Sequence, residues 1–164
     1  MADAALHGLI DDHDRVVRHP LHKEELLAEL VAVGRGRGVA QARAVIEFAT
    51  GLSGSAGESC SRVGFMLLGL PTPVLQQVFR DRSGLIGYAD FWWPECNLIG
   101  EFDGEGKYTK PAFLRGRTPE QALADEKRRE DRLRARGPMV SRWGWDVALS
   151  LPRLRAHLRD AGLR

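Results

Sequence analysis

The stretch YADFWWPECNLIGEFDGEGKY, residues 88–108, has the pattern of two apolar β-strands joined by the tight turn PECN, yet it carries Asp90, Glu101 and Asp103. A carboxylate buried without a partner costs several kcal/mol, so each acid must face a cation, hydrogen-bond donors or solvent. Side chains alternate along a strand, so Glu101 and Asp103 share one face. The turn makes Asp90 a cross-strand neighbour of Glu101, or nearly so. The pattern predicts a self-repelling cluster that a divalent cation or basic groups would neutralise, and a hard cation such as Mg²⁺ fits best.

The segments around this stretch predict a domain of mixed α/β class. Apolar residues recur with a period of two over 73–81, 85–93, 97–104 and 139–145, which is typical of strands. They recur with the helical period over 56–69, 118–137 and 151–162. The predicted order is therefore helix, three-stranded meander, helix, strand, helix. We expect two apolar faces to turn inward, formed by Val63, Met66 and Leu67 in the first helix and by Leu151, Leu154 and Leu158 in the last.

The residues before this core predict an N-terminal helical collar. Helical patterns cover 3–10, 22–33 and 39–50, and the glycine-rich GRGRG at 34–38 separates the last two. GRGRG lacks the strand and the spacing of a phosphate-binding loop, so we interpret it as a hinge or turn. The expected division is an N-terminal helical segment over 1–38 and a second domain over 39–164.

The net charge of +2 conceals an asymmetry along the chain. Residues 1–110 hold 11 Lys or Arg against 15 Asp or Glu, a balance of −4, and residues 111–164 hold 13 against 7, a balance of +6. The basic half, with EKRREDRLRAR at 126–136, is a candidate surface for a polyanion. The alternative is a solvated helix face whose charges pair internally, as Lys127 could with Asp131.

Composition limits the class of protein. Nothing approaches 18 consecutive apolar residues, and the first residues lack the features of a signal peptide, so we expect a cytoplasmic protein without a membrane partner. Cys60 and Cys96 have neither the spacing of a zinc site nor a disulfide framework. The four tryptophans, in or beside predicted strands, are expected to fill the core rather than to stack on bases.

The residues resemble the PD-(D/E)XK nuclease superfamily. GES with SR, GLPTPVLQ, ADFWWPECNLIGEFDG, KY and EKRREDRLRARG followed by RWGW are similar to very short patch repair-like endonuclease domains. They are especially similar to the C-terminal domain of AbiEi-type proteins of type IV toxin–antitoxin and abortive-infection systems. The resemblance covers about residues 40–164. It implies a restriction endonuclease-like core and a Mg²⁺- or Mn²⁺-dependent endonuclease or nickase that hydrolyses DNA.

The resemblance also implies roles for individual residues. Asp90 matches the acid of the second strand and Glu101 the first acid of the third strand, which both hold the metal. Glu58 matches the helix acid that completes the site in a subset of members, although an acid in a first helical turn is also a common partner of the helix dipole. Asp103 stands where the superfamily has a lysine, and we expect it to orient water or hold a second ion.

Two lysines are candidates for the missing basic group, and each is equally explained as a surface charge. Lys127 on the following helix is the first choice and Lys107 the second, since a lysine would stabilise charge developing on phosphorus.

DNA is the expected partner, and a protein partner or a homodimer is the alternative. Phosphate contacts that do not read sequence are expected from basic side chains. The candidates are Arg62, Lys107, Arg128, Arg129 and Arg132. The absent motif lysine leaves a second function open, a nuclease-fold module of a toxin–antitoxin or phage-defence system that binds DNA or protein without cleaving.

Overall fold

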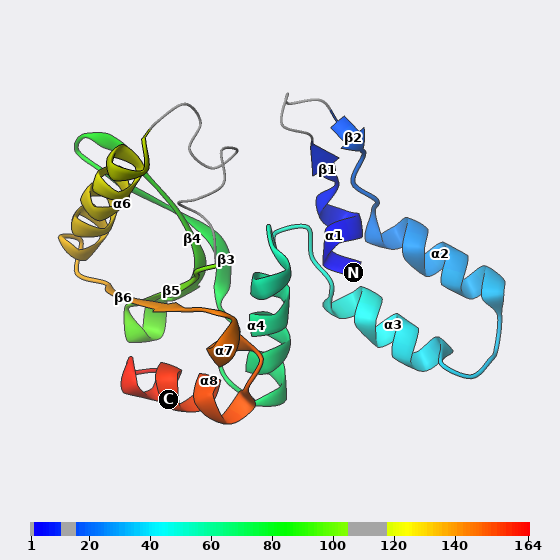
Figure 1. Cartoon of the computed structure of the whole chain (residues 1–164). Helices are drawn as coiled ribbons and strands as arrows, with labels where there is room; N and C mark the ends of the chain where they lie inside the picture. Colours follow the sequence, from blue (N-terminus) through cyan, green and yellow to red (C-terminus); the bar gives the residue numbers. More distant parts are fainter. Residues whose placement is uncertain (1, 11–15, 105–117) are drawn as a thin grey trace. The chain divides into compact units, whose positions relative to one another are not determined.

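The computed structural model describes residues 2–10, 16–104 and 118–164 (Figure 1). The chain forms two compact units, Met1–Ala56 and Gly57–Arg164. The division falls after Ala56 and not after residue 38, because the helices on either side of GRGRG, α2 (Lys23–Val33) and α3 (Val39–Phe48), pack on each other.

The first unit contains a short hairpin as well as helices. Helix α1 (Ala2–His7) precedes strands β1 (Leu9–Ile10) and β2 (Val16–Arg18), which pair antiparallel. The helix predicted over 3–10 is therefore wrong beyond His7, where Gly8 has a φ of 78°. The buried Asp3 carboxylate accepts a hydrogen bond of 2.8 Å from the Thr50 amide, which ties the two ends of this unit together.

The second unit confirms the predicted α/β class and the predicted order of elements, except that a short helix begins at Trp145, within the strand predicted over 139–145. These elements are α4 (Ala56–Leu67), β3 (Val74–Asp81), β4 (Gly84–Trp93), the 3₁₀ turn η1 (Pro94–Cys96), β5 (Leu98–Phe102), α6 (Pro119–Arg134), β6 (Met139–Trp143), α7 (Trp145–Ala148) and α8 (Leu151–Asp160). The sheet order is β3-β4-β5-β6. The pairs β3–β4 and β4–β5 are antiparallel, and β5–β6 is parallel, with α6 in the connection between them.

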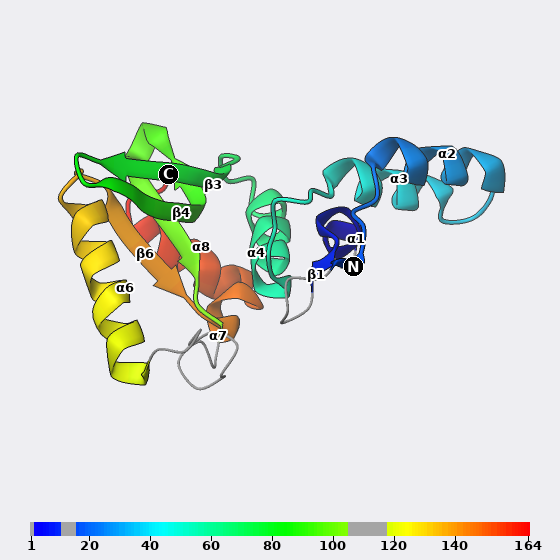
Figure 2. The same ribbon diagram turned by 90° about the horizontal axis from the view of Figure 1, so that it is seen from above.

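Each face of this sheet has its own apolar core. Along β5, Leu98 and Phe102 belong to a cluster that includes residues of α4, α7 and α8, whereas Ile99 belongs to a second cluster that includes Leu133 of α6. This alternation is the period-two pattern of a strand that is covered on both faces. Figure 2 shows α6 beside the sheet, away from α8.

Helix α4 packs on the core through Phe65 and small side chains, and not through the apolar residues that the sequence selected. The predicted apolar face is wrong, since Val63, Met66 and Leu67 are 40%, 51% and 61% exposed. The buried residues of α4 are instead Gly57, Glu58, Ser61, Gly64 and Phe65. Glycine and serine allow the helix to lie close to its neighbours, which is why a search for an apolar stripe selected the opposite side.

Two tryptophans fill the core as predicted, and each indole N–H has a partner. Trp93 donates to the Pro71 carbonyl at 2.8 Å, and Trp143 donates to the Ser61 hydroxyl at 2.9 Å. In α8, Leu154 and Leu158 are fully buried as expected, but Leu151 is 38% exposed. None of the helices that the structure describes has the length and apolar character needed to cross a membrane.

Helix α6 begins as the sequence predicts and is held to the sheet largely by charge. The Thr118 hydroxyl accepts a hydrogen bond from the Gln121 backbone amide. The Thr118 backbone amide in turn donates to Oε1 of the Gln121 side chain. Few apolar residues of α6 reach the core, chiefly Ala122 and Leu133. Polar contacts with β3, β4, β5 and β6 supply the rest of its attachment.

Candidate functional site

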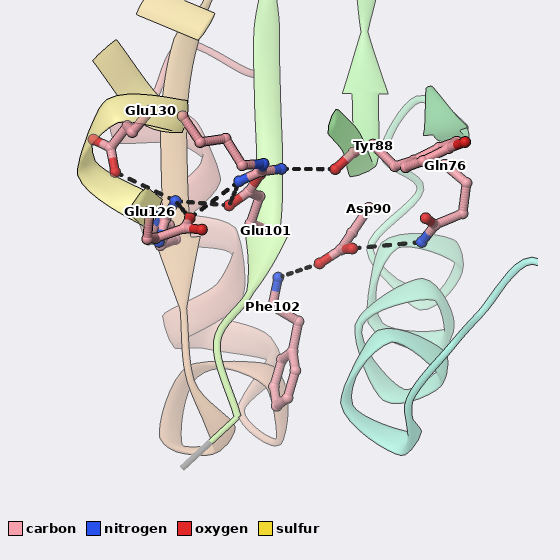
Figure 3. Close-up of polar contacts among 9 residues, drawn as sticks. Gln76, Tyr88, Asp90, Glu101, Phe102, Glu126 and Glu130 are labelled. Carbon is pink, nitrogen blue, oxygen red and sulfur yellow. Dashed lines mark hydrogen bonds and ion pairs between the residues drawn. The ribbon is translucent and has the colours of Figure 1, made fainter. Parts of the chain in front are cut away.

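Asp90 lies where β4 and β5 part. The paired residues of these strands end at Phe91 and Gly100, so Asp90 and Glu101 would form the next pair. The Phe102 amide instead donates to Asp90 Oδ2 at 3.0 Å (Figure 3). A side-chain carboxylate therefore takes the place of a strand carbonyl, and its second oxygen, Oδ1, is directed toward β3.

Glu58 and Asp90 converge on one amide group. Gln76 Nε2 lies 3.3 Å from Glu58 Oε2 and 3.4 Å from Asp90 Oδ1. Glu58 comes from the first turn of α4, Asp90 from β4 and Gln76 from β3, so three elements meet here. Glu58 is 9% exposed, so this acid of the first helical turn is buried and not solvated.

Sequence reasoning missed Gln76. Gln76 is the last residue of the motif GLPTPVLQ, but nothing in that motif assigned it a role in the site. The structure marks it by its backbone, because Gln76 has a φ of 50° inside β3. The left-handed region is unusual for a residue with a long side chain, and such conformations gather at functional sites.

Glu101 belongs to a separate group of charges. We call this group the arginine–glutamate cluster, and it consists of Glu101, Glu126, Arg129, Glu130 and Arg142. Arg129 reaches Glu101 Oε1 at 2.7 Å and Arg142 reaches Oε2 at 2.9 Å. Arg129 also donates to the Tyr88 carbonyl at 2.7 Å, and both arginines pair with Glu126. Figure 3 shows Glu101 together with Glu126 and Glu130 of α6, apart from Asp90 and Gln76.

The cluster keeps both arginines charged. Burial opposes the charge of Arg142, but its hydrogen bond to Glu126 and the surrounding carboxylates outweigh burial and hold the pKa of its guanidinium above the ordinary value. The same balance, with Glu101 as the hydrogen-bond partner, raises the pKa of Arg129. Arg142 Nε is buried without a hydrogen-bond partner, so the guanidinium is positioned by its ion pairs. Arg142 was not among the residues that the sequence singled out.

The cluster of three carboxylates that the sequence predicted is not present. Among the residues that the structure describes, no group of three or more His, Cys, Asp or Glu could hold a metal ion. The physical reason is that two guanidinium groups neutralise Glu101, which therefore needs no cation. Of the acids predicted to form the site, Glu58 and Asp90 share the Gln76 amide, and a cation at this place stays a prediction.

The remaining predicted site residues lie in different surroundings. Asp103 is half-buried just after β5, and its amide donates to the Trp143 carbonyl at 2.8 Å. Lys127 is exposed on α6, although its neighbour Glu126 faces the sheet. Lys107 lies outside the described residues.

Two of the predicted phosphate-binding arginines are engaged in holding α6. Arg129 is committed to the arginine–glutamate cluster, and Arg132 forms a two-point ion pair with Asp81, at 2.7 Å for each bond. Arg128 is 71% exposed and pairs only locally with Asp125. Arg62 is half-buried on α4. Of the three α6 arginines predicted to bind phosphate, Arg128 is thus the most exposed to solvent.

Comparison with known proteins gives distant relatives. No family model matches the chain. Two proteins of Mycobacterium tuberculosis are each 38% identical over 90 residues: Uncharacterized protein MT2308 of strain CDC 1551 / Oshkosh, and Uncharacterized protein Rv2248 of strain ATCC 25618 / H37Rv. The match covers 54% of this chain and 33% of each relative, so the chain spans about a third of their length. No solved structure matches.

The contact between Arg132 and Asp81 gives stability a dependence on acid pH. The hydrogen bond from Arg132 lowers the pKa of Asp81 from 3.8 to about 2. A carboxyl whose pKa is lower in the folded state stabilises the fold above its unfolded pKa, and this stabilisation is lost as the pH falls through the folded pKa. The window is therefore from about pH 4 down to about pH 2.

We expect Asp81→Asn to melt below the parent protein at pH 6 and to approach it as the pH falls through this window. Thermal melts of both proteins from pH 6 to pH 2 measure the difference. Ser83→Ala is the control, because the Ser83 contact to Asp81 is made by its backbone amide and survives the change. A constant difference between parent and Asp81→Asn at every pH would contradict the assignment.

Proposed function

We propose that the second unit is a Mg²⁺- or Mn²⁺-dependent endonuclease or nickase that hydrolyses DNA phosphodiester bonds through a restriction endonuclease-like core. The observation that carries this proposal is the convergence of Glu58 and Asp90 on one amide group. Mg²⁺ in phosphoryl-transfer sites commonly takes one or two carboxylates and completes its shell with water and substrate phosphate oxygens. The donor set of two carboxylates therefore fits this ion.

When bound, the ion would polarise a phosphoryl oxygen and lower the pKa of a water molecule that attacks phosphorus. The chain would supply the oxygens of Glu58 and Asp90 as ligands. The Phe102 amide holds Asp90 Oδ2 at 3.0 Å, and Oδ1, which accepts from Gln76 Nε2 at 3.4 Å, would be the oxygen offered to the ion. Asp103, directly after this amide in the chain, is the proposed residue for orienting water.

The proposed basic groups lie on α6. Lys127 is exposed and would stabilise charge developing on the phosphate when DNA lies across this helix. Arg128 is the leading phosphate contact, because it is 71% exposed and its one ion pair is with the neighbouring Asp125. Arg129 and Arg132 would act indirectly, by fixing the position of the helix.

A second function is favoured by the arginine–glutamate cluster. Glu101, the strand acid that the resemblance assigns to the metal, is occupied by Arg129 and Arg142. A nuclease fold that has lost this ligand would bind DNA, a protein or a second copy of itself without cleaving. Such a module would serve a toxin–antitoxin or phage-defence system. Substitutions of the acids would then change the affinity for DNA or for the partner, and there would be no turnover to change.

A plasmid-cleavage assay separates the two functions. We expect the parent protein to convert supercoiled plasmid to nicked or linear DNA with Mg²⁺ or Mn²⁺ and not with EDTA, and we expect Asp90→Asn to abolish the conversion. Glu95→Gln, on the exposed η1 turn, is the control that should cleave like the parent. No cleavage by the parent with either ion would favour the binding module, and cleavage that survives Asp90→Asn would refute the proposed site.

A further inference from the structure

The amide of Gln76 lies between carboxylates from two different elements. A primary amide has two N–H donors at one end and a carbonyl acceptor at the other. With Nε2 at 3.3 Å from Glu58 and 3.4 Å from Asp90, each N–H serves one carboxylate. The carbonyl end could not take this position without repelling both acids. A cation at the same place would reverse this preference, because it requires oxygen and is repelled by N–H.

We propose that Gln76 is a positioning residue that works as an amide switch. Its NH₂ group bridges Glu58 and Asp90 when no cation is bound, and a half-turn about the last side-chain bond presents Oε1 to a divalent cation. The inference rests on the proposed function, because it takes the cation site at Glu58 and Asp90 from it. It adds a third oxygen ligand to those of Glu58 and Asp90, from the residue that ends the motif GLPTPVLQ.

The backbone supports a positioning role. Gln76 and Asn97 are the non-glycine residues with positive φ in the described part of the chain, with values of 50° and 48°. Asn97 ends the η1 turn, where asparagine tolerates this conformation. Gln76 has no such reason, since β3 pairs in register at Leu75 and Gln77 on either side of it. The surrounding strand holds it in a disfavoured conformation that brings its amide to the acids.

The chemistry explains why a neutral amide suits this position. A lysine would neutralise the acids permanently and repel a cation, because its ammonium group has donors only. A glutamate would add a third negative charge, which destabilises the fold unless a cation is present. Glutamine alone of these three offers a donor in one state and an acceptor in the other.

The two charged substitutions are therefore expected to act in opposite directions. Thermal melts of the full chain would be recorded in EDTA and in several millimolar Mn²⁺. Gln76→Glu should melt below the parent in EDTA, by roughly 4 to 8 °C, and should gain more than the parent from Mn²⁺. Gln76→Lys should melt at or above the parent in EDTA and should gain nothing from Mn²⁺. At a residue that only fills space, substitution by Glu and by Lys would not change the melting temperature in opposite directions.

The neighbouring glutamine provides the matched control. Gln77 lies in the same strand, and its side chain donates to the Val78 carbonyl at 2.9 Å. Gln77→Glu and Gln77→Lys should keep the parent's response to Mn²⁺. If Gln76→Glu does not fold in EDTA, recovery of its folded circular dichroism spectrum on addition of Mn²⁺ supports the switch, and failure to recover overturns it.

Failure of the switch and failure of the proposed function give different results. If the parent gains stability from Mn²⁺ and both Gln76 variants keep that gain, the switch is wrong and the cation site stands. If Gln76→Lys also melts below the parent in EDTA, Gln76 is a packing residue and the switch is again wrong. If no protein, the parent included, responds to Mn²⁺, both the switch and the cation site are wrong.

Discussion

Glu101→Ala is expected to lower the free energy of unfolding by about 3 kcal/mol, because it removes a buried carboxylate that two partly buried guanidinium groups share. The Glu101 side chain is 8% exposed, and those of Arg129 and Arg142 are 23% and 24% exposed. This partial exposure places the effect at the lower end of the range for broken buried ion pairs. Urea denaturation at pH 7 without metal measures it.

The sequence alone predicts the opposite sign. Removal of one acid from a self-repelling cluster would raise stability without metal, whereas removal of the partner of two arginines lowers it. Glu95→Ala, at an exposed position in η1, is the control and should change stability by less than about 0.5 kcal/mol. Unchanged or increased stability of Glu101→Ala would show that the arginines do not depend on this carboxylate.

This result bears on how cleavage data are interpreted. A destabilised Glu101→Ala protein would lose activity whether or not Glu101 touches the metal. Asp90→Asn is the more informative change, because Asp90 accepts hydrogen bonds from two neutral groups, the Gln76 side-chain amide and the Phe102 backbone amide.

Gly57→Ala is expected to lower the free energy of unfolding by about 2 kcal/mol, in the usual range for overpacking. A Cβ atom at Gly57 would lie 2.0 Å from Phe102 Cε1 and 2.1 Å from Cζ. The Phe102 ring is 4% exposed and packs edge-on against Trp145, with ring centroids 4.9 Å apart, so it has little room to move. The gain of up to about 1 kcal/mol from replacing glycine by alanine in a helix is smaller than this cost.

A double-mutant cycle tests the mechanism. Phe102→Leu removes the ring that the new methyl group meets, so Gly57→Ala should cost less in that background than alone. Gly144→Ala is the matched control, since its Cβ would meet its nearest neighbours, in Asp103 and Asp146, at 3.6 Å, an ordinary contact. Equal cost of Gly57→Ala with and without the Phe102 ring would refute the clash.

The order of elements in the second unit could be predicted because its signals are local. The change of apolar period at residue 73 marks the start of the strands. The start of α6 is marked by four consecutive residues that begin with Thr118 and Pro119. The parallel pairing of β5 with β6 is harder to predict from the sequence, because the two strands are separated by α6 and its connections. The face of α4 was predicted wrongly, because close packing through Gly57, Ser61 and Gly64 leaves no apolar periodicity to find.

Of the candidate site, only the acidic residues have signals in the sequence. Asp90 and Glu58 have sequence signals, an acid inside an apolar strand and an acid in a first helical turn. The partner of each acid comes from elsewhere in the chain, and sequence spacing does not reveal it. Glu101 is joined to Arg129 and Arg142, which lie 28 residues and farther along the chain. Gln76 ends the motif GLPTPVLQ, but its distinguishing feature is its backbone conformation, which the sequence does not reveal.

The attachment of α6 by charge has a consequence for measurements on nucleic acid. Dissolved salt weakens the partly exposed ion pairs that hold this helix, such as Arg132 with Asp81. It also weakens any contact between arginines of the helix and phosphates. Ionic strength thus acts at the same time on the attachment of α6 to the sheet and on any contacts of α6 with DNA. A steep decline of DNA affinity with salt would then report both processes, and its slope would overstate the number of phosphates that the protein touches.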